Sequence, residues 1–195
     1  MTTTTLTPPR SNGRLMLALV VSLLALPFAI GAGLYFGGWK PARTIQHGQL
    51  LNPPVAFPVG SLLASNGQPL PGSELQGKWL LVLSLNGPCQ AECVSRIDEM
   101  RRIQVSLNKD MGRLRRVVVS QHTEAPELAA ASRQQPDLLL LAAPPQSLST
   151  SAGEARYQLH IVDPQGRRVM DYPPEVAARE VRADLDRLLK FAWTG

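Results

Sequence analysis

The chain has few of the residues from which catalytic and metal sites are most often built. Its 195 residues include only 2 cysteines and 3 histidines, and aromatic residues make up 5% of the total. It contains no HExxH zinc motif, no GxSxG nucleophile motif and no phosphate-binding glycine loop, which argues against a zinc hydrolase, a serine hydrolase and a nucleotide-binding enzyme. Hydrophobic residues nevertheless reach 44%, so an apolar core can form without a scaffold of disulfides.

Acidic residues are missing from the first part of the chain, where the excess positive charge is found. The net charge is +5, and no aspartate or glutamate precedes residue 51. The basic residues of that part flank an uncharged run, and they are Arg10, Arg14, Lys40 and Arg43. Acidic and basic side chains nearly balance in the rest of the chain, so no basic face for phosphate groups is indicated. We therefore expect no nucleic-acid partner.

The uncharged run covers residues 15–39, LMLALVVSLLALPFAIGAGLYFGGW. About 20 apolar residues cross a bilayer core as a helix, so the run is long enough for a transmembrane anchor in the lipid bilayer. A cleaved secretory signal is the alternative, because Ala29 and Gly31 are small enough for a cleavage site. We expect an uncleaved anchor, with Tyr35 and Trp39 at the membrane interface.

The residues around the run suggest how the chain is divided. Residues 1–14 are too few to fold and are expected to form a cytoplasmic tail. Residues 40–58 are proline-rich and lack periodicity, which favours a linker, and residues 59–195 carry nearly all the mass. We expect a single-pass protein of a bacterial inner membrane, with the C-terminal domain in the periplasm, where thiol redox chemistry is possible.

Beyond the linker, apolar patterns of strand and helix type alternate. The predicted elements are a hairpin at 62–70, a buried strand at 77–85, a helix from Cys93 to about Met111, a strand at 114–120, a helix at 126–135, a strand or helix end at 137–143, a polar loop at 144–155, a hairpin at 157–172 and a helix at 174–191. Interleaved strands and helices predict an α/β domain with helices on both faces of one sheet.

Both cysteines, Cys89 and Cys93, lie between the predicted strand 77–85 and the helix that follows it. A thiolate at a helix N-terminus is stabilised by the unpaired N–H groups and by the helix dipole. We expect Cys89, in the loop, to be the more exposed and attacking thiol, and Cys93 to resolve the mixed disulfide. The same soft thiolates suit Cu(I). A plain structural disulfide is the alternative, although so short a loop gains little stability.

The three histidines and one arginine cluster are the remaining candidates for functional residues. His122 follows the strand 114–120, whose carboxyl end should share a sheet edge with the cysteine loop, so it is a candidate third copper ligand or proton acceptor. A solvated loop histidine is the plainer interpretation. His160, in a strand, and His47, in the linker, are interpreted as structural. The cluster at residues 113–116 is interpreted as surface at the strand entry rather than a docking patch.

Three sequence features together resemble the thioredoxin-like superfamily: the strand GKWLLVLSL (77–85), the CxxxC pair after it, and the DPQGR turn (163–167) before a terminal helix. Within the superfamily the chain is most similar to the Sco/SenC group, membrane-anchored proteins that help to insert copper into the binuclear centre of cytochrome c oxidase. The resemblance covers about residues 60–191 and the anchor. It implies a thioredoxin-like mixed sheet with helices on both faces, preceded by one N-terminal transmembrane helix.

The chain departs from that family pattern at three positions. Ala155 stands where Sco-type proteins have the histidine that completes the copper site. Val94 replaces the proline that usually follows the second cysteine, and Arg156 stands near the proline that shapes the client groove of thioredoxins. Neither the usual copper site nor the usual dithiol site is complete.

The resemblance and its departures lead to one main hypothesis and two alternatives. The main hypothesis is a protein that assists cytochrome c oxidase assembly by thiol–disulfide exchange, or by transient Cu(I) handling, at Cys89 and Cys93 with His122 nearby. If active, it is a thiol–disulfide reductase rather than a metabolic enzyme. The first alternative is a non-catalytic thioredoxin-like module that binds an oxidase subunit or assembly factor. The second is a general periplasmic disulfide reductase, against which Arg156 counts.

Overall fold

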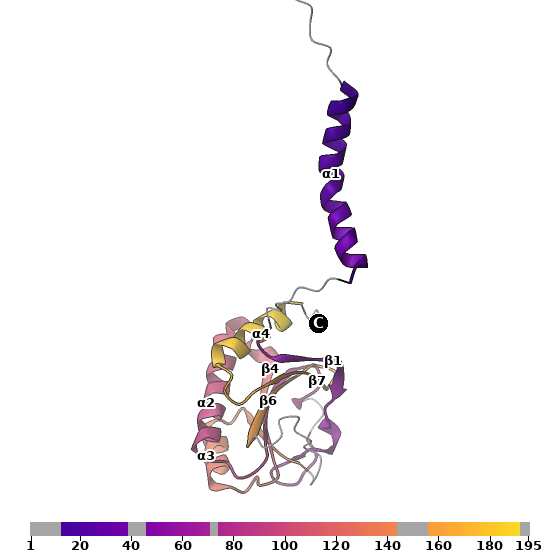
Figure 1. Cartoon of the computed structure of the whole chain (residues 1–195). Helices are drawn as coiled ribbons and strands as arrows, with labels where there is room; N and C mark the ends of the chain where they lie inside the picture. The colour runs from indigo at the N-terminus through magenta and orange to yellow at the C-terminus, as the bar shows by residue number, and fades with distance from the viewer. Residues whose placement is uncertain (1–12, 39–45, 71–73, 144–155, 192–195) are drawn as a thin grey trace, which may run out of the picture. The chain divides into compact units, whose positions relative to one another are not determined.

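The computed structural model describes residues 13–38, 46–70, 74–143 and 156–191. The chain is divided into two units, and the division lies between residues 45 and 46. The described part of the first unit contains one helix, α1 (Gly13–Phe36), with Pro27 inside it and no buried residue (Figure 1). Its 24 residues extend about 36 Å at about 1.5 Å per residue, enough for a bilayer core of about 30 Å. The mean hydropathy of its most apolar window is 2.5, so the predicted N-terminal helix is confirmed as a candidate membrane span.

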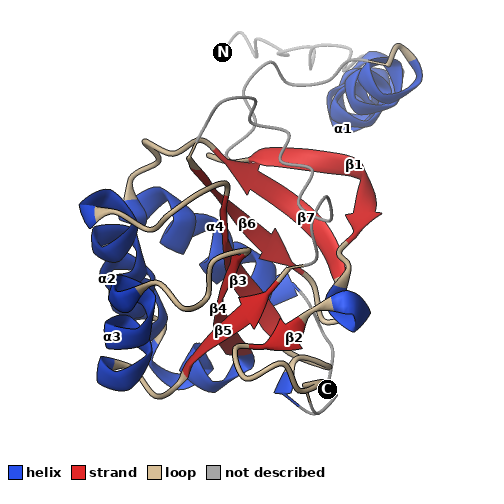
Figure 2. Ribbon diagram, turned by 90° about the horizontal axis from the view of Figure 1, so that it is seen from below, coloured by secondary structure: helices blue, strands red, loops and turns tan. Residues whose placement is uncertain are grey.

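The second unit is built on one mixed sheet of seven strands, in the order β1-β7-β6-β3-β4-β5-β2 (Figure 2). The strands are β1 (Gln49–Ala56), β2 (Leu63–Ala64), β3 (Trp79–Leu85), β4 (Leu114–Ser120), β5 (Leu138–Ala142), β6 (Tyr157–Val162) and β7 (Arg167–Tyr172). β3, β4 and β5 run parallel, and all other pairs are antiparallel. The predicted thioredoxin-like mixed sheet is confirmed.

Strand β3 lies at the centre of the sheet, and all its residues are buried. It pairs with β4 on one side and β6 on the other. A continuous apolar sequence is typical of a strand covered on both faces. Leu81 and Leu83 belong to one core cluster, whereas Leu80 and Val82 belong to a second cluster on the opposite face.

Three helices cover the first face: α2 (Ala91–Ser106), α3 (Pro126–Gln134) and α4 (Ala178–Phe191). Their apolar residues share a single core cluster, and Figure 1 shows α2 and α3 side by side. Because the strands follow the order β3-β4-β5, two right-handed crossovers place α2 and α3 on the same face.

The other face of the sheet has a different cover in its described part. This cover comes from residues 57–70 and 74–75, which include the short 3₁₀ helix η1 (Val59–Ser61) and the buried residues Leu62 and Leu75. The predicted hairpin at 62–70 is present only as a tight turn with one bridge, Leu63 to Pro69, because β2 pairs with β5. The predicted loop 144–155 lies outside the described residues.

Three element boundaries differ from the sequence-based expectation. Residues 49–56 of the predicted linker form the edge strand β1, which tolerates Pro53 and Pro54 because an edge strand has one side without ladder partners. Helix α2 ends at Ser106, and the 3₁₀ helix η3 (Asn108–Arg113) follows, so Met111 is not part of the α2 stripe. Helix α4 begins at Ala178 rather than at 174. The remaining strands and helices of the domain lie where the pattern predicts them.

Arg116 was expected at the surface and is fully buried. Its Nε donates to Gln104 Oε1 of α2 at 2.6 Å, and another guanidinium nitrogen donates to Asp137 Oδ1 at 2.8 Å. A third nitrogen donates to Gln135 Oε1, next to the end of α3. The arginine therefore links β4 to the helices above it, and its burial is tolerated because the guanidinium is hydrogen-bonded.

Asp184 of α4 holds the first residues of the domain in place. Its Oδ2 accepts hydrogen bonds from the backbone N–H groups of His47 at 2.9 Å and Gly48 at 3.1 Å, and from the Tyr172 hydroxyl at 3.1 Å. Burial raises the pKa of Tyr172, and the charge and hydrogen bond of Asp184 raise it further. Gly48 packs so closely on β7 that a Cβ atom would lie 2.6 Å from both Met170 Cγ and Tyr172 Cε1.

We predict that Gly48→Ala lowers the free energy of unfolding by about 1–3 kcal/mol, because the added methyl overpacks a closed contact. Urea denaturation of the full chain in detergent, followed by circular dichroism, measures the change. Gly112→Ala is the matched control, since nothing lies within 4 Å of its Cβ position. Equal losses of unfolding free energy in the two variants would show that the site of Gly48 has room for a methyl group.

We predict that Asp137→Asn weakens the acid sensitivity of the domain. Burial raises the pKa of Asp137, but the hydrogen bond and positive charge of Arg116 outweigh this and hold the pKa below its ordinary value. A carboxyl with a lowered folded-state pKa stabilises the fold above its ordinary pKa of about 3.9, and this contribution disappears as the pH falls through the folded-state value. The Tm of the wild type should therefore fall more than the Tm of the variant when the pH is lowered from about 5 to about 3. Parallel Tm curves would contradict the assignment.

Candidate thiol–disulfide site

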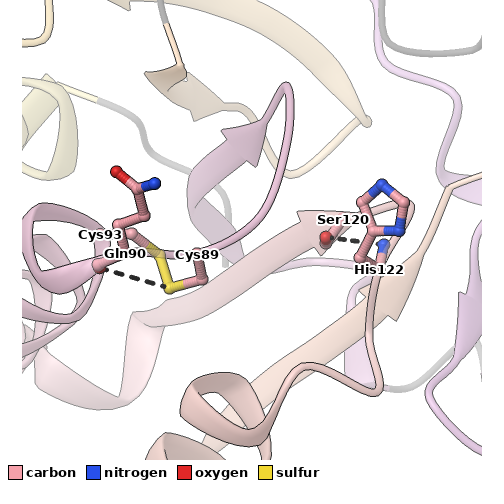
Figure 3. Close-up of a disulfide and its surroundings, with 5 residues drawn as sticks. All are labelled: Cys89, Gln90, Cys93, Ser120 and His122. Atoms are coloured by element: carbon pink, nitrogen blue, oxygen red, sulfur yellow. Dashed lines mark hydrogen bonds between the residues drawn. A yellow bond between two sulfur atoms is a disulfide. The ribbon is translucent and has the colours of Figure 1, made fainter.

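The two cysteines form a disulfide where the central strand passes into α2. Cys89 lies in the loop after β3, Cys93 lies in the first turn of α2, and their Cα atoms are 5.4 Å apart (Figure 3). The predicted strand–loop–helix arrangement around the CxxxC motif is confirmed.

The local sequence explains why the strand stops and the helix starts here. The residues Asn86, Gly87 and Pro88 follow the end of β3, and Pro88 has no N–H group with which to continue a ladder. The N-cap residue of α2 is Gln90, whose side chain makes no capping hydrogen bond. The N–H groups of the first turn are thus not satisfied by their cap, and the positive end of the helix dipole lies beside the sulfur atoms.

The prediction that Cys89 is an exposed thiol is wrong, because both cysteines are buried to nearly the same extent. Cys89 is 5% exposed and Cys93 is 4% exposed, and both belong to the core cluster that contains Leu85, Ile97 and Leu159. The loop folds back onto the end of β3, so Cys89 packs against the core instead of projecting from it. Cys89 Sγ also makes a weak polar contact, 3.9 Å from the carbonyl oxygen of Gln90.

A small void adjoins the site on the Cys93 side. Its volume is about 10 Å³, and it is lined by Leu85, Pro88, Gln90, Glu92, Cys93, Arg156 and Tyr157. A void of that size holds about one water molecule. Arg156 and Gln90 both line this void, and the guanidinium of Arg156 donates a hydrogen bond to the side-chain oxygen of Gln90.

His122 is not brought together with the cysteines. It is exposed, its backbone N–H donates to Ser120 Oγ at 3.0 Å, and Figure 3 shows its ring well separated from the disulfide. The parallel pairing of β3 and β4 does place both loops at one sheet edge, as expected, but the chain after β4 carries the imidazole away.

The described residues do not fit a resident copper centre. They contain no group of three histidine, cysteine or acidic side chains that could hold a metal ion. The two sulfur atoms are bonded to each other, which removes them as thiolate ligands. Ala155, at the position of the family's copper-ligand histidine, lies outside the described residues.

The other two histidines have structural surroundings. His160 is 1% exposed, and its Nδ1 lies 2.8 Å from Asp171 Oδ1 on the neighbouring strand. This supports the structural interpretation. His47 is held by its backbone at Asp184, and its Nδ1 lies 3.9 Å from Glu180 Oε1, so it belongs to the folded domain rather than to a linker.

Sequence reasoning missed the contact between Arg156 and Gln90. The contact could have been predicted from the order of the strands, because a strand that pairs antiparallel with β3 begins beside the end of β3. The register pairs Leu85 with Tyr157, and the backbone N–H of Asn86 donates to the carbonyl oxygen of Arg156 at 2.8 Å. The residue before β6 therefore lies beside the cysteine loop.

A central strand, a disulfide at the start of the next helix and an antiparallel hairpin before a terminal helix define a thioredoxin-like protein. Residues 79–192 match the family model described as "Transmembrane-like, thioredoxin-like, C-terminal domain". The chain belongs to this family. Comparison with curated proteins found no match.

Several solved structures share the fold. The apo Sco1 protein of Thermus thermophilus is 23% identical, with a TM-score of 0.55 over 76% of this chain and 99% of that chain. Yeast Sco1 with copper bound is 14% identical, with a TM-score of 0.52 over 77% of this chain and 96% of that chain. A putative protein disulfide isomerase from Bacteroides thetaiotaomicron is 12% identical, with a TM-score of 0.53 over 72% of this chain and 90% of that chain. At these identities the similarity confirms the Sco-like fold alone.

We predict that His122→Ala leaves the rate at which dithiothreitol reduces the disulfide unchanged within about twofold, because the imidazole does not contact either sulfur. The reduced variant should also bind Cu(I) as weakly as the reduced wild type, in a titration against a competing chelator. A tight one-to-one Cu(I) complex that is lost on this substitution would show that His122 is a ligand after all.

Proposed function

We propose that this chain is a membrane-anchored, thioredoxin-like protein that assists cytochrome c oxidase assembly by thiol–disulfide exchange at Cys89 and Cys93. The observation that carries the proposal is the disulfide between the loop after the central strand and the first turn of α2. The Sco-like fold and the CxxxC and DPQGR motifs support the link to the oxidase.

The exchange follows from the position of the two sulfur atoms. A client thiolate attacks one sulfur of the bond and forms a mixed disulfide, and the other sulfur leaves as a thiolate. A second client thiolate then releases the protein as a dithiol, so two electrons pass from the client to the pair. The reductase activity expected from the sequence is the same two steps in reverse, in which the reduced pair passes two electrons to a client disulfide. The first turn of α2 stabilises the Cys93 thiolate of the reduced pair through its uncapped N–H groups and its dipole.

Copper handling is the less supported branch. In the reduced protein the two thiolates would be soft ligands for Cu(I), but the described residues offer no third ligand next to them. A pair of thiolates without a third ligand suits transient carriage better than a tight store. Thiol exchange needs only the two sulfur atoms that the structure already brings together.

The proposed location rests on α1. We assign residues 15–39 to a single span of a bacterial inner membrane, residues 1–14 to the cytoplasm and the folded domain to the periplasm. The apolar length of α1 supports the span, and an oxidising compartment suits a disulfide-bearing domain. The partner in this setting is an oxidase subunit or assembly factor that presents thiols near the membrane.

The burial of both sulfur atoms favours one alternative function. At 5% and 4% exposure, the disulfide resembles a structural bridge, and a thioredoxin-like domain with such a bridge can act as a non-catalytic binding module for an oxidase subunit or assembly factor. The two functions differ in whether the thiols are required.

We predict that the double variant Cys89→Ser/Cys93→Ser, expressed in the native bacterium deleted for this chain, fails to restore oxidase activity. The reason is that no other thiol in the chain can replace the pair. Oxidase activity of isolated membranes is the measurement, and immunoblotting confirms that the variant accumulates.

His122→Ala is the control, and it should restore activity fully. Full restoration by the double cysteine variant would instead identify the protein as a binding module.

A further inference from the structure

A buried disulfide cannot exchange until something above it moves. Both sulfur atoms lie in the core cluster, and the void beside Cys93 measures only about 10 Å³. That space holds about one water molecule, so the sulfur of an incoming thiolate does not fit without displacing the lining. If the pair exchanges with client thiols, as the proposed function requires, some part of this lining must move.

The lining of the void contains one contact between two mobile polar side chains. Gln90 and Arg156 are both exposed, and the Arg156 guanidinium donates to Gln90 Oε1. Of the other lining residues, Glu92 is exposed in the first turn of α2, and the rest are fixed by the fold. Leu85 and Tyr157 are ladder partners of β3 and β6, and Pro88 and Cys93 belong to the turn and the helix.

The backbone at both ends of this contact is anchored. The carbonyl oxygen of Arg156 accepts from the N–H of Asn86 at 2.8 Å, which fixes the start of β6 against the cysteine loop. Gln90 is the N-cap residue of α2, and the N–H of Val94 donates to its carbonyl oxygen at 3.1 Å. The side chains of Gln90 and Arg156 can therefore swing aside while the loop and helix stay in place.

We propose that Gln90 and Arg156 form a gate over Cys93 that controls access to the disulfide. The closed gate is the hydrogen-bonded pair, and the open gate exposes the Cys93 sulfur to an attacking thiolate. Both residues act through the opening rather than on the reacting atoms, so they are positioning residues. The arginine that departs from the thioredoxin pattern thus has a role of its own at this site.

A gate has a kinetic signature that an electrostatic role lacks. Opening precedes attack in both directions, so loss of the gate speeds reduction and reoxidation by the same factor and leaves their ratio unchanged. If Arg156 acted through its charge on a Cys93 thiolate, its removal would change the ratio and would slow reduction. The two roles therefore predict opposite changes in the rate of reduction when Arg156 is removed. They also differ in whether the ratio of the reduction and reoxidation rates changes.

The test uses the full chain in detergent and dithiothreitol as the probe. A dithiothreitol thiolate attacks one protein sulfur and releases the other as a thiolate, and its second thiolate then closes the dithiothreitol ring. Two electrons pass to the protein, and oxidised dithiothreitol reverses the reaction. Rate constants in both directions are measured for the wild type, Arg156→Ala, Gln90→Ala and the double variant.

We expect each single variant to react about two- to fivefold faster in both directions, the effect of losing one exposed charged hydrogen bond. Since either substitution opens the same gate, the double variant should be no faster than the faster single variant. Gln90→Ala is a clean partner because the Gln90 side chain makes no capping bond that its loss would break. Arg102→Ala, an exposed arginine elsewhere on α2, is the matched control and should not change the rates.

Unchanged or slower rates in Arg156→Ala would overturn the gate, and so would additive acceleration in the double variant or a changed ratio of the two rate constants. A Tm close to that of the wild type shows that a faster variant has not simply unfolded. Because the probe is a small dithiol, a gate can be found even if no oxidase client is exchanged, so failure of the proposed function is a separate result.

Discussion

The pairing of β3 between β4 and β6 is the constraint on which the site depends. A strand buried on both faces needs apolar residues throughout, and β3 has buried residues at every position. Its parallel partner requires a crossover, which α2 supplies, and its antiparallel partner begins where β3 ends. The chain must therefore turn beside the start of β6, and the two cysteines are placed in that turn and in the first turn of α2.

The same constraint both creates the site and limits it. The N-terminus of α2 brings its uncapped N–H groups to the sulfur atoms, which favours a thiolate. The packing that holds this helix on the sheet also buries the disulfide. A pair that is chemically prepared for exchange and sterically closed requires a local movement, and the proposed gate assigns that movement to the exposed, hydrogen-bonded side chains of Gln90 and Arg156. With such a gate, burial of the disulfide controls its reaction with thiols and does not preclude it.

Much of the fold could be predicted from the sequence, and the site only in part. The apolar run of β3, the period of α2 and the DPQGR turn are local signals, and each gave the right element. Arg116 was misplaced because pattern reasoning assigns charges to the surface, whereas Gln104, Gln135 and Asp137 satisfy it in the interior. Strand β1 was missed because Pro53 and Pro54 mask an edge strand. The exposure of Cys89 and the position of His122 depend on contacts between distant segments, which no local pattern specifies.

The reduction potential of the Cys89–Cys93 pair tests the central claim most directly. Equilibration of the full chain with dithiothreitol redox buffers, followed by alkylation and mass analysis of the thiols, gives the value. A working pair is predicted to lie above about −300 mV. A value well below that limit would mark a structural bridge and would contradict thiol exchange as the function of this site.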